Sequence, residues 1–260
     1  KTLAFSQARF ATATDAEGST VNLGLGIRNR PDDVSMVGGN VFLDYRMTDY
    51  SDAHSRLGLG IRHRPNDDSM FGANAFWDYR MTDYSDAHSR LGLGGEYFWK
   101  DLEFRNNLYM AITETKNINA NGVSYGERVV PGWDLEVGYR LPNNPELAFF
   151  VKGFNWDYSD RSDNSGIEGS LSWQASPYIG LEAYLSNEIA AASTTANSSL
   201  PSNEEMFFGL RMNITSTPVK FEKENYKKIM ITHMTQPVKR KYDVLLERSS
   251  GNLAVNFIGI

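Results

Sequence analysis

The sequence of 260 residues contains no cysteine and no long hydrophobic run. Without cysteine, neither a disulfide framework nor a thiolate metal site can form. No stretch approaches the roughly 18 to 20 consecutive apolar residues that a transmembrane helix requires, which excludes a helical membrane protein. Cations are outnumbered as well, and the net charge of −6 argues against a nucleic-acid partner. These absences leave a soluble β protein and a transmembrane β-barrel, whose strands are only half apolar.

Residues 23–56 are followed directly by a near copy, residues 57–90. The copies differ at 7 of 34 positions, and residues 44–56 are identical to residues 78–90. In a strand, side chains alternate between two faces. All four differences inside the strand lie on the apolar face, at Val37/Phe71, Gly39/Ala73, Val41/Ala75 and Leu43/Trp77. The polar face is the same in both copies.

A packed protein core would register each of these changes of volume. The apolar face is therefore expected to contact something fluid, and the polar face to line a hydrogen-bonded interior, as in a transmembrane barrel. We expect the following residues to face lipid: Val37, Val41, Leu43, Phe71, Ala75, Trp77, Trp133 and Leu135. Opposite charges should meet across a polar lumen. Candidates for that network are Asp44, Arg46, Arg62, Asp78, Arg80, Glu96, Arg105, Asp134, Glu136, Arg140 and Arg211.

Alternation with a period of two recurs along most of the chain and gives thirteen candidate strands, most of them about 9 to 13 residues long. The pattern predicts an all-β protein with one domain over residues 1–260, an antiparallel up-and-down barrel. Short connections alternate with longer ones, and the longer set is normally extracellular. Residues 216–250 are basic and irregular; part of 221–234 is expected to form a helix that Pro237 ends, and 251–260 a last short strand. A soluble sheet with one wet face also alternates, so that alternative stays open.

Catalytic and metal sites are not favoured by the sequence. Residues Asp83, Ser85, Asp86 and His88, with their copies Asp49, Ser51, Asp52 and His54, contain the residue types of a Ser/His/acid site. Two identical copies on adjacent hairpins indicate a duplicated loop rather than one convergent site. The four histidines are scattered, whereas a metal site needs several converging ligands. We expect no enzyme, no metal and no cofactor.

Three stretches resemble the intimin/invasin translocator barrel, the β-domain of inverse autotransporters. They are RLGLGGEYFWKDLEF (90–104), ERVVPGWDLEVGYRLPNNPEL (127–147) and the hairpin at 21–46; residues 241–257 are similar to the end of that domain. The resemblance implies a 12-stranded barrel in the bacterial outer membrane that exports and anchors a C-terminal passenger, usually an adhesin. It also implies the lipid bilayer, the chain's own passenger, periplasmic chaperones and the barrel-assembly machinery as partners.

The chain departs from that family in ways that bear on the strand count. The family's first strand has no counterpart before Lys1, where no signal peptide is found either, and the repeat adds two strands. We expect a mature or excised segment with 12 to 14 strands, enlarged by the repeat. Closure would come from a further strand before Lys1, from a strand recruited from 238–248, or from a weak candidate that does not span. No passenger follows Ile260, so translocation and anchoring are the expected functions, and a general pore or structural barrel is the alternative.

Overall fold

The computed structural model describes residues 2–13, 19–47, 53–82, 84–85, 87–120, 123–160, 163–187 and 206–250; the side chains of 13, 44–47, 53, 120 and 250 are not part of this description. The candidate strand at 251–260 lies outside the described residues. So do the loop residues Asp49, Ser51, Asp52, Asp83 and Asp86.

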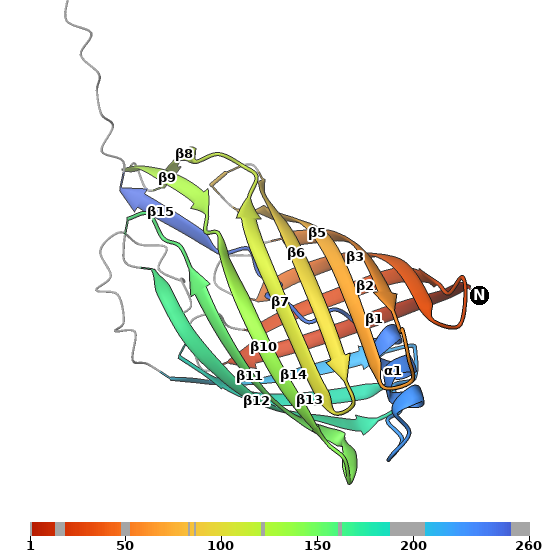
Figure 1. The fold of residues 1–260 in the computed structure, drawn as a ribbon. Coiled ribbons are helices and arrows are strands. Elements are labelled where there is room, and N and C mark those ends of the chain that lie inside the picture. Colours follow the sequence, from red (N-terminus) through yellow and green to blue (C-terminus); the bar gives the residue numbers. More distant parts are fainter. Residues whose placement is uncertain are drawn as a thin grey trace, which may run out of the picture.

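Twelve antiparallel strands of the described chain close into a barrel, in the order β1-β14-β13-β12-β11-β10-β7-β6-β5-β4-β3-β2 (Figure 1). The alternation of apolar and polar residues gives each strand one outward and one inward face. The strands are β1 (Thr2–Ala13), β2 (Ser19–Asn29), β3 (Ser35–Met47), β4 (Ala53–His63), β5 (Ser69–Met81), β6 (His88–Trp99), β7 (Leu102–Ala111), β10 (Gly132–Leu141), β11 (Asn144–Trp156), β12 (Asn164–Ser176), β13 (Ile179–Ser186) and β14 (Phe207–Thr215). The predicted all-β barrel is thus confirmed.

The barrel closes between its first and last strands. β1 pairs with β14 antiparallel, from Gln7 opposite Thr215 to Ala13 opposite Gly209. Both copies of the repeat lie in the wall, over β2 to β6. The twelve strands fall within the expected 12 to 14, but the expected enlargement by the repeat is wrong, because twelve strands that include both copies complete the circle. An even number is also what antiparallel closure requires.

A strand recruited from residues 238–248 was one of the three open ways to close the barrel, and these residues supply no strand of the wall. The strand β15 (Leu246–Ser250) pairs instead with β9 (Val123–Val129), which pairs with β8 (Lys116–Ala120). This three-stranded sheet lies at one end of the barrel (Figure 1). That end carries the long connections and is called the long-loop end. The other, the short-turn end, carries the turns at 30–34, 64–68, 100–101, 142–143 and 177–178.

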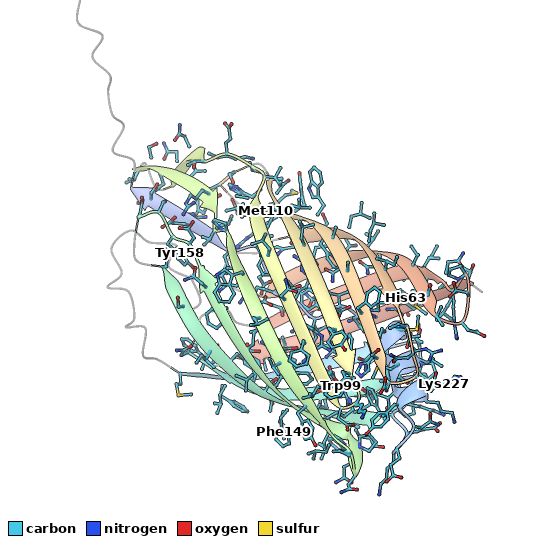
Figure 2. All side chains as sticks on the ribbon, in the orientation of Figure 1. His63, Trp99, Met110, Phe149, Tyr158 and Lys227 are labelled. Atoms are coloured by element: carbon cyan, nitrogen blue, oxygen red, sulfur yellow. The ribbon has the colours of Figure 1, made fainter. Side chains whose placement is uncertain are left out.

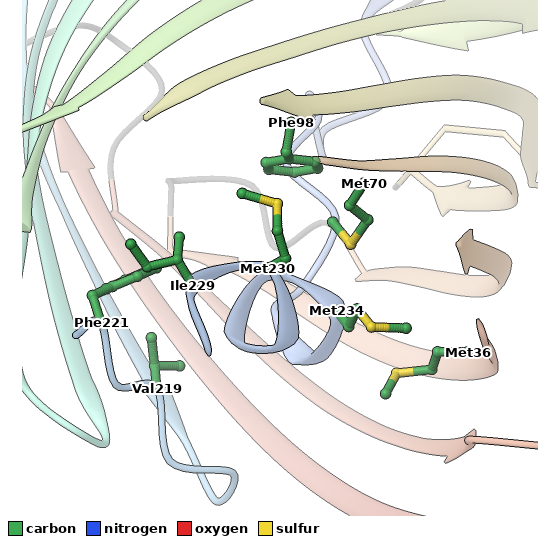
Figure 3. Packing of buried hydrophobic residues seen from close by; sticks show 8 residues of the cluster. All are labelled: Met36, Met70, Phe98, Val219, Phe221, Ile229, Met230 and Met234. Atoms are coloured by element: carbon green, nitrogen blue, oxygen red, sulfur yellow. The ribbon is translucent and has the colours of Figure 1, made fainter. Parts of the chain in front are cut away.

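The helix α1 (Tyr226–Thr235) lies at the short-turn end (Figure 1). Asn225 caps its first turn by accepting a hydrogen bond from the Lys228 N–H. One face of α1 packs into a cluster of buried apolar side chains that includes Met36 and Met70, which are equivalent residues of the two copies (Figure 3). The cluster consists of Met36, Met70, Phe98, Val219, Phe221, Ile229, Met230 and Met234. No helix among the described residues has the length and apolar character to cross a membrane.

Candidate functional site

The chain re-enters the barrel after its last wall strand. Residues 216–225 turn back from β14 at the short-turn end, where the Val219 N–H donates to the Pro177 carbonyl at 2.7 Å. After α1, residues 236–245 run along the inside of the wall to the long-loop end, where β15 begins (Figure 1). We call residues 236–245 the luminal segment.

Arginines of the second repeat copy hold this segment by its backbone. The Arg62 guanidinium donates to the carbonyls of His233 (2.9 Å), Met234 (3.2 Å) and Gln236. The last carbonyls of a helix have no partner within it, and a cation there also meets the negative end of the helix dipole. Arg90 donates to the carbonyls of Lys241 (3.0 Å) and Asp243 (2.7 Å), and Arg80 donates to that of Val244.

Side chains of β7 continue this contact. The Asn107 amide donates to the Lys239 carbonyl at 3.3 Å. The Tyr109 hydroxyl accepts a hydrogen bond from the Lys241 N–H at 2.7 Å and donates to the Asp134 carboxylate at 2.6 Å. Hydrogen bonds between neutral backbone groups and side chains add modestly to stability, but leaving such groups unpaired in a buried place is costly. The wall therefore satisfies the backbone of the luminal segment almost residue by residue.

Three side chains of the luminal segment make contacts of their own. Arg240 forms a two-point ion pair with Asp78, which is fully buried and also accepts from Arg90. The Lys239 ammonium lies 3.7 Å from a Glu136 oxygen and 3.8 Å from a Glu182 oxygen. The Tyr242 ring stands between two guanidinium groups, those of Arg9 at 4.4 Å and Arg56 at 4.2 Å.

The predicted lumen charges point inward and pair across neighbouring strands. Arg62 meets Glu96 at 2.8 Å, and Arg105 lies within ion-pair distance of Glu96 and Glu136. The structure brings Arg62, Asp78, Arg80, Glu96, Arg105, Asp134, Glu136, Arg140 and Arg211 into the lumen. Asp44 and Arg46 lie on β3, and their side chains are outside the described part of the chain. Buried charges of this kind persist where each has a partner.

Several functional residues were missed by sequence reasoning. Glu103 binds both Arg105 and Arg140, and Glu168 binds both Lys152 and Arg211. Their polar-face positions were visible in the alternation, but their partners were not. The position of the luminal segment was indicated only by its basic composition, since its contacts are made largely through the backbone.

The residues expected to face lipid point outward. Seven of the eight are between 47% and 64% exposed, and Ala75 is partly exposed. They belong to a continuous set of outward apolar side chains on all twelve strands (Figure 2), larger than soluble monomers leave in water. Such a surface requires an apolar surrounding, which a bilayer supplies.

The three-stranded sheet of β8, β9 and β15 is called the exterior sheet. It holds the chain where the chain leaves the barrel. Glu247 and Arg248 of β15 stand opposite Arg128 and Glu127 of β9, and their ion pairs measure 2.8 Å and 2.6 Å. Burial raises the pKa of Glu127, but hydrogen bonds from His88, Ser85 and Arg248 outweigh it and lower the pKa to about 2. The carboxylate is therefore charged over the whole physiological range.

Ser85, His88 and Glu127 lie together, but not as a catalytic triad. In a triad the hydroxyl and the carboxylate bind different ring nitrogens of the histidine. Here Ser85 Oγ (3.0 Å) and Glu127 (2.9 Å) both approach Nε2 of His88. Ser85 also donates directly to Glu127 at 2.6 Å. The arrangement ties the β5–β6 connection to the exterior sheet.

The fold and the site together define a transmembrane β-barrel whose lumen holds its own chain. In sequence, the inverse autotransporter β-domain matches residues 1–61 and again 51–242, so both matches include part of the repeated region. The chain belongs to this family of translocator and anchor barrels, and its place is the bacterial outer membrane. No curated protein matches the sequence.

Solved structures share the barrel fold. A chain from a study of in-meso crystallization of membrane proteins superposes with a TM-score of 0.72 at 18% identity, over 94% of this chain and 100% of that one. The KdgM porin gives 0.49 at 8% identity, over 84% and 99%. Outer membrane phospholipase A from Escherichia coli gives 0.45 at 12% identity, over 80% and 92%. At 18% identity, the first of these likenesses bears on the fold alone.

Proposed function

We propose that this barrel exports a C-terminal passenger, an adhesin of the intimin/invasin kind, and anchors it at the cell surface. The path of the chain carries the proposal. After the wall is complete, the chain enters at the short-turn end and leaves at the long-loop end, where β15 pairs with β9. In outer-membrane barrels short turns are periplasmic and long loops extracellular. With that orientation, β15 lies on the outer side of the membrane, where a passenger would be displayed.

The same proposal assigns the parts of the chain. Residues 1–260 form one barrel domain in which the outward apolar residues contact lipid and the inward charges form the lumen network. Backbone contacts from Arg62 and Arg90 suit a pore that must accept many passenger sequences. The passenger, periplasmic chaperones and barrel-assembly machinery are partners that the family resemblance adds.

Surface display tests this function. A small reporter domain is fused after Ile260 and the fusion is produced in a bacterium with an outer membrane. Protease added to intact cells should remove the reporter while the barrel stays resistant. The matched control carries the reporter before Thr2, at the short-turn end, where it should survive until the outer membrane is broken. Heat-dependent gel mobility shows whether the barrel is folded. If the barrel is folded but the reporter after Ile260 resists protease on intact cells, export is contradicted.

A general diffusion pore is the second candidate, because a cavity of about 200 Å³ lies beside the luminal segment. Its lining includes Gln7, Arg9 and Asn22 of the wall and Lys239 and Tyr242 of the luminal segment. Porins leave a continuous aqueous channel. In planar bilayers a barrel filled by its luminal segment should be nearly closed, whereas steady conductance would favour the pore.

A further inference from the structure

Most contacts between the wall and the luminal segment do not distinguish one residue from another. Arg62, Arg90 and Asn107 donate to backbone carbonyls, and Tyr109 accepts from a backbone N–H. Every residue except proline offers the same groups. A chain that shifts by two residues along this wall would therefore recover similar hydrogen bonds. Something else must determine which residue comes to rest at which place.

Arg240 makes the most specific contact in the lumen. Its side chain is almost fully buried, and its Nη1 donates to Asp78 Oδ1 at 3.0 Å while Nη2 donates to Oδ2. Its guanidinium also lies over the Phe76 ring at 4.4 Å. The Lys239 contacts with Glu136 and Glu182 are longer, at 3.7 and 3.8 Å. A two-point pair between a planar guanidinium and a carboxylate combines strength with a demand on geometry.

Gly92 on β6 has no side chain, and this leaves space for the side chain of Arg240. Two earlier glycines of the wall lie beneath phenylalanine rings: a Cβ at Gly24 would stand 2.2 Å from Phe42, and one at Gly58 would stand 2.3 Å from Phe76. At Gly92 the same Cβ would stand 2.6 Å from Nη2 of Arg240. At this third position a side chain of the luminal segment occupies the space that a wall phenylalanine occupies at the other two.

The first repeat copy does not reproduce this place. In the second copy Asp78 is directly opposite Arg90, two residues from Gly92 along β6. In the first copy Asp44 is opposite His54 instead, and a Cβ at Gly58 would meet both Asn40 and Phe76. The register of the first copy therefore does not bring an aspartate directly opposite an arginine beside an open glycine, as the second copy does with Asp78, Arg90 and Gly92.

We propose that Asp78, Arg90 and Gly92 form an arginine socket, which binds an arginine side chain of the exported polypeptide and sets where the chain comes to rest. The inference rests on the proposed export function and adds to it the residue that is recognised. Backbone contacts hold any chain, and the socket holds Arg240. Arg90 serves both, since its Nε donates to Asp78 while its Nη1 donates to the Asp243 carbonyl of the segment.

The resting register can be measured with a disulfide, because the chain has no cysteine of its own. Gly126 of β9 is directly opposite Ser249 of β15, and the Ser249 hydroxyl lies 2.8 Å from where a Cβ on Gly126 would stand. The pair G126C and S249C should therefore join in the native register. If the chain moved outward by two residues, the pair G126C and E247C would join instead.

Both pairs are tested in the full chain with a reporter after Ile260. R240Q should lower the yield of the first disulfide about tenfold, as expected for the loss of charge-assisted hydrogen bonds. R240Q combined with V238R should move the arginine by two residues, so that the second disulfide becomes the major one. The matched control, V238R with Arg240 kept, should retain the first disulfide. D78N tests the socket from the wall side and should act as R240Q does.

Reporter display and disulfide yield, measured on the same cells, distinguish a failure of the export function from a failure of the arginine socket. If the reporter of the parent protein never reaches the surface, the export function is wrong. If the reporter is displayed and the barrel is folded, but the first disulfide persists in R240Q and in R240Q with V238R, the socket is wrong. In that case the pairing of β15 with β9 would determine the register alone.

Discussion

Asp78 and Arg90 lie directly opposite each other on β5 and β6, with 2.9 Å between Arg90 Nε and an Asp78 oxygen. Their copies in the first hairpin do not: Asp44 is opposite His54, and Arg56 is opposite Phe42. Two hairpins that share the identical residues 44–56 and 78–90 thus pair in registers that differ by two residues. A shift of two keeps each side chain on its own face of the sheet, so both registers preserve the apolar exterior.

This difference predicts unequal effects of the same substitution in the two copies. Asp78→Ala would leave Arg90 and Arg240 without their carboxylate in a buried place, which typically costs about 3 to 5 kcal/mol. Asp44→Ala is the matched control, and we expect a smaller loss because its position lacks the opposing arginine. Guanidinium unfolding of both variants in detergent measures the difference. Equal losses would contradict a special role for the second copy.

Gly92→Ala should destabilise the luminal segment without disturbing the wall. The new Cβ would stand 2.6 Å from Arg240 Nη2, so the arginine must leave Asp78, at a cost of about 1 to 3 kcal/mol. Gly169→Ala is the control, since no atom lies within 4 Å of its Cβ position. Protease cleavage within residues 236–245 should rise in the first variant only. Similar protection in both variants would argue that Arg240 is loosely held.

The wall was predictable because the sequence of each strand shows which side chains face outward and which face the lumen. Val41 and Leu43 face outward and Phe42 faces inward, as alternation with a period of two indicates. Strand pairing was less accessible. The identical residues 44–56 and 78–90 cannot themselves specify two registers, so contacts elsewhere must select them, among them those of Asp78 with Arg240 and of His88 with Glu127.

The contents of the lumen were the least predictable part of the site. Alternation placed Glu103 on the polar face beside Arg105, yet its second partner, Arg140, comes from a strand 37 residues away. The luminal segment is bound largely through its carbonyls, which every residue possesses. Its basic composition was the one visible sign, and Lys239 and Arg240 do meet carboxylates of the wall.

Charge on the outer face should be costly in proportion to its depth. Val41→Arg or Ala75→Arg should destabilise the barrel by about 2 to 4 kcal/mol if the position lies near the bilayer midplane. Asn119→Arg is the control, because Asn119 is exposed on β8 of the exterior sheet and meets no hydrocarbon. Unfolding of barrels refolded into lipid vesicles gives the comparison. An arginine tolerated equally at all three positions would contradict the lipid-facing assignment.

The exterior sheet should loosen in acid. Glu127 has a folded-state pKa of about 2, below its ordinary value of 4.5, and the pKa of Glu247 is also lowered, since backbone N–H groups of Ser159 and Asp160 outweigh its burial. A carboxyl with a depressed pKa stabilises the folded state above its ordinary pKa, and this contribution is lost as pH falls toward the folded value.

We therefore expect β15, in the protein without engineered cysteines, to become sensitive to an acid protease as pH falls from about 4.5 toward 2. Glu127→Gln combined with Glu247→Gln should remove most of that pH dependence and make the strand sensitive at neutral pH as well. Gln at Glu146, an exposed residue of β11, is the control. Unchanged protection of β15 in the parent protein down to the lowest pH would contradict the assignment of these ion pairs as its fastening.

Arg62→Gln should open the short-turn end of the lumen. Arg62 satisfies the last carbonyls of α1 and is itself held by Glu96, so its loss uncaps the helix and leaves the buried Glu96 with only the longer Arg105 contact at 3.7 Å. The apolar cluster around Met230 would still bind α1, but less firmly, and we expect flickering conductance in planar bilayers where the parent protein is nearly closed. Arg28→Gln is the matched control, because Arg28 is the equivalent residue of the first copy and its guanidinium lies over the Phe5 ring of β1. Equal conductance in both variants would show that α1 is retained by its apolar face alone.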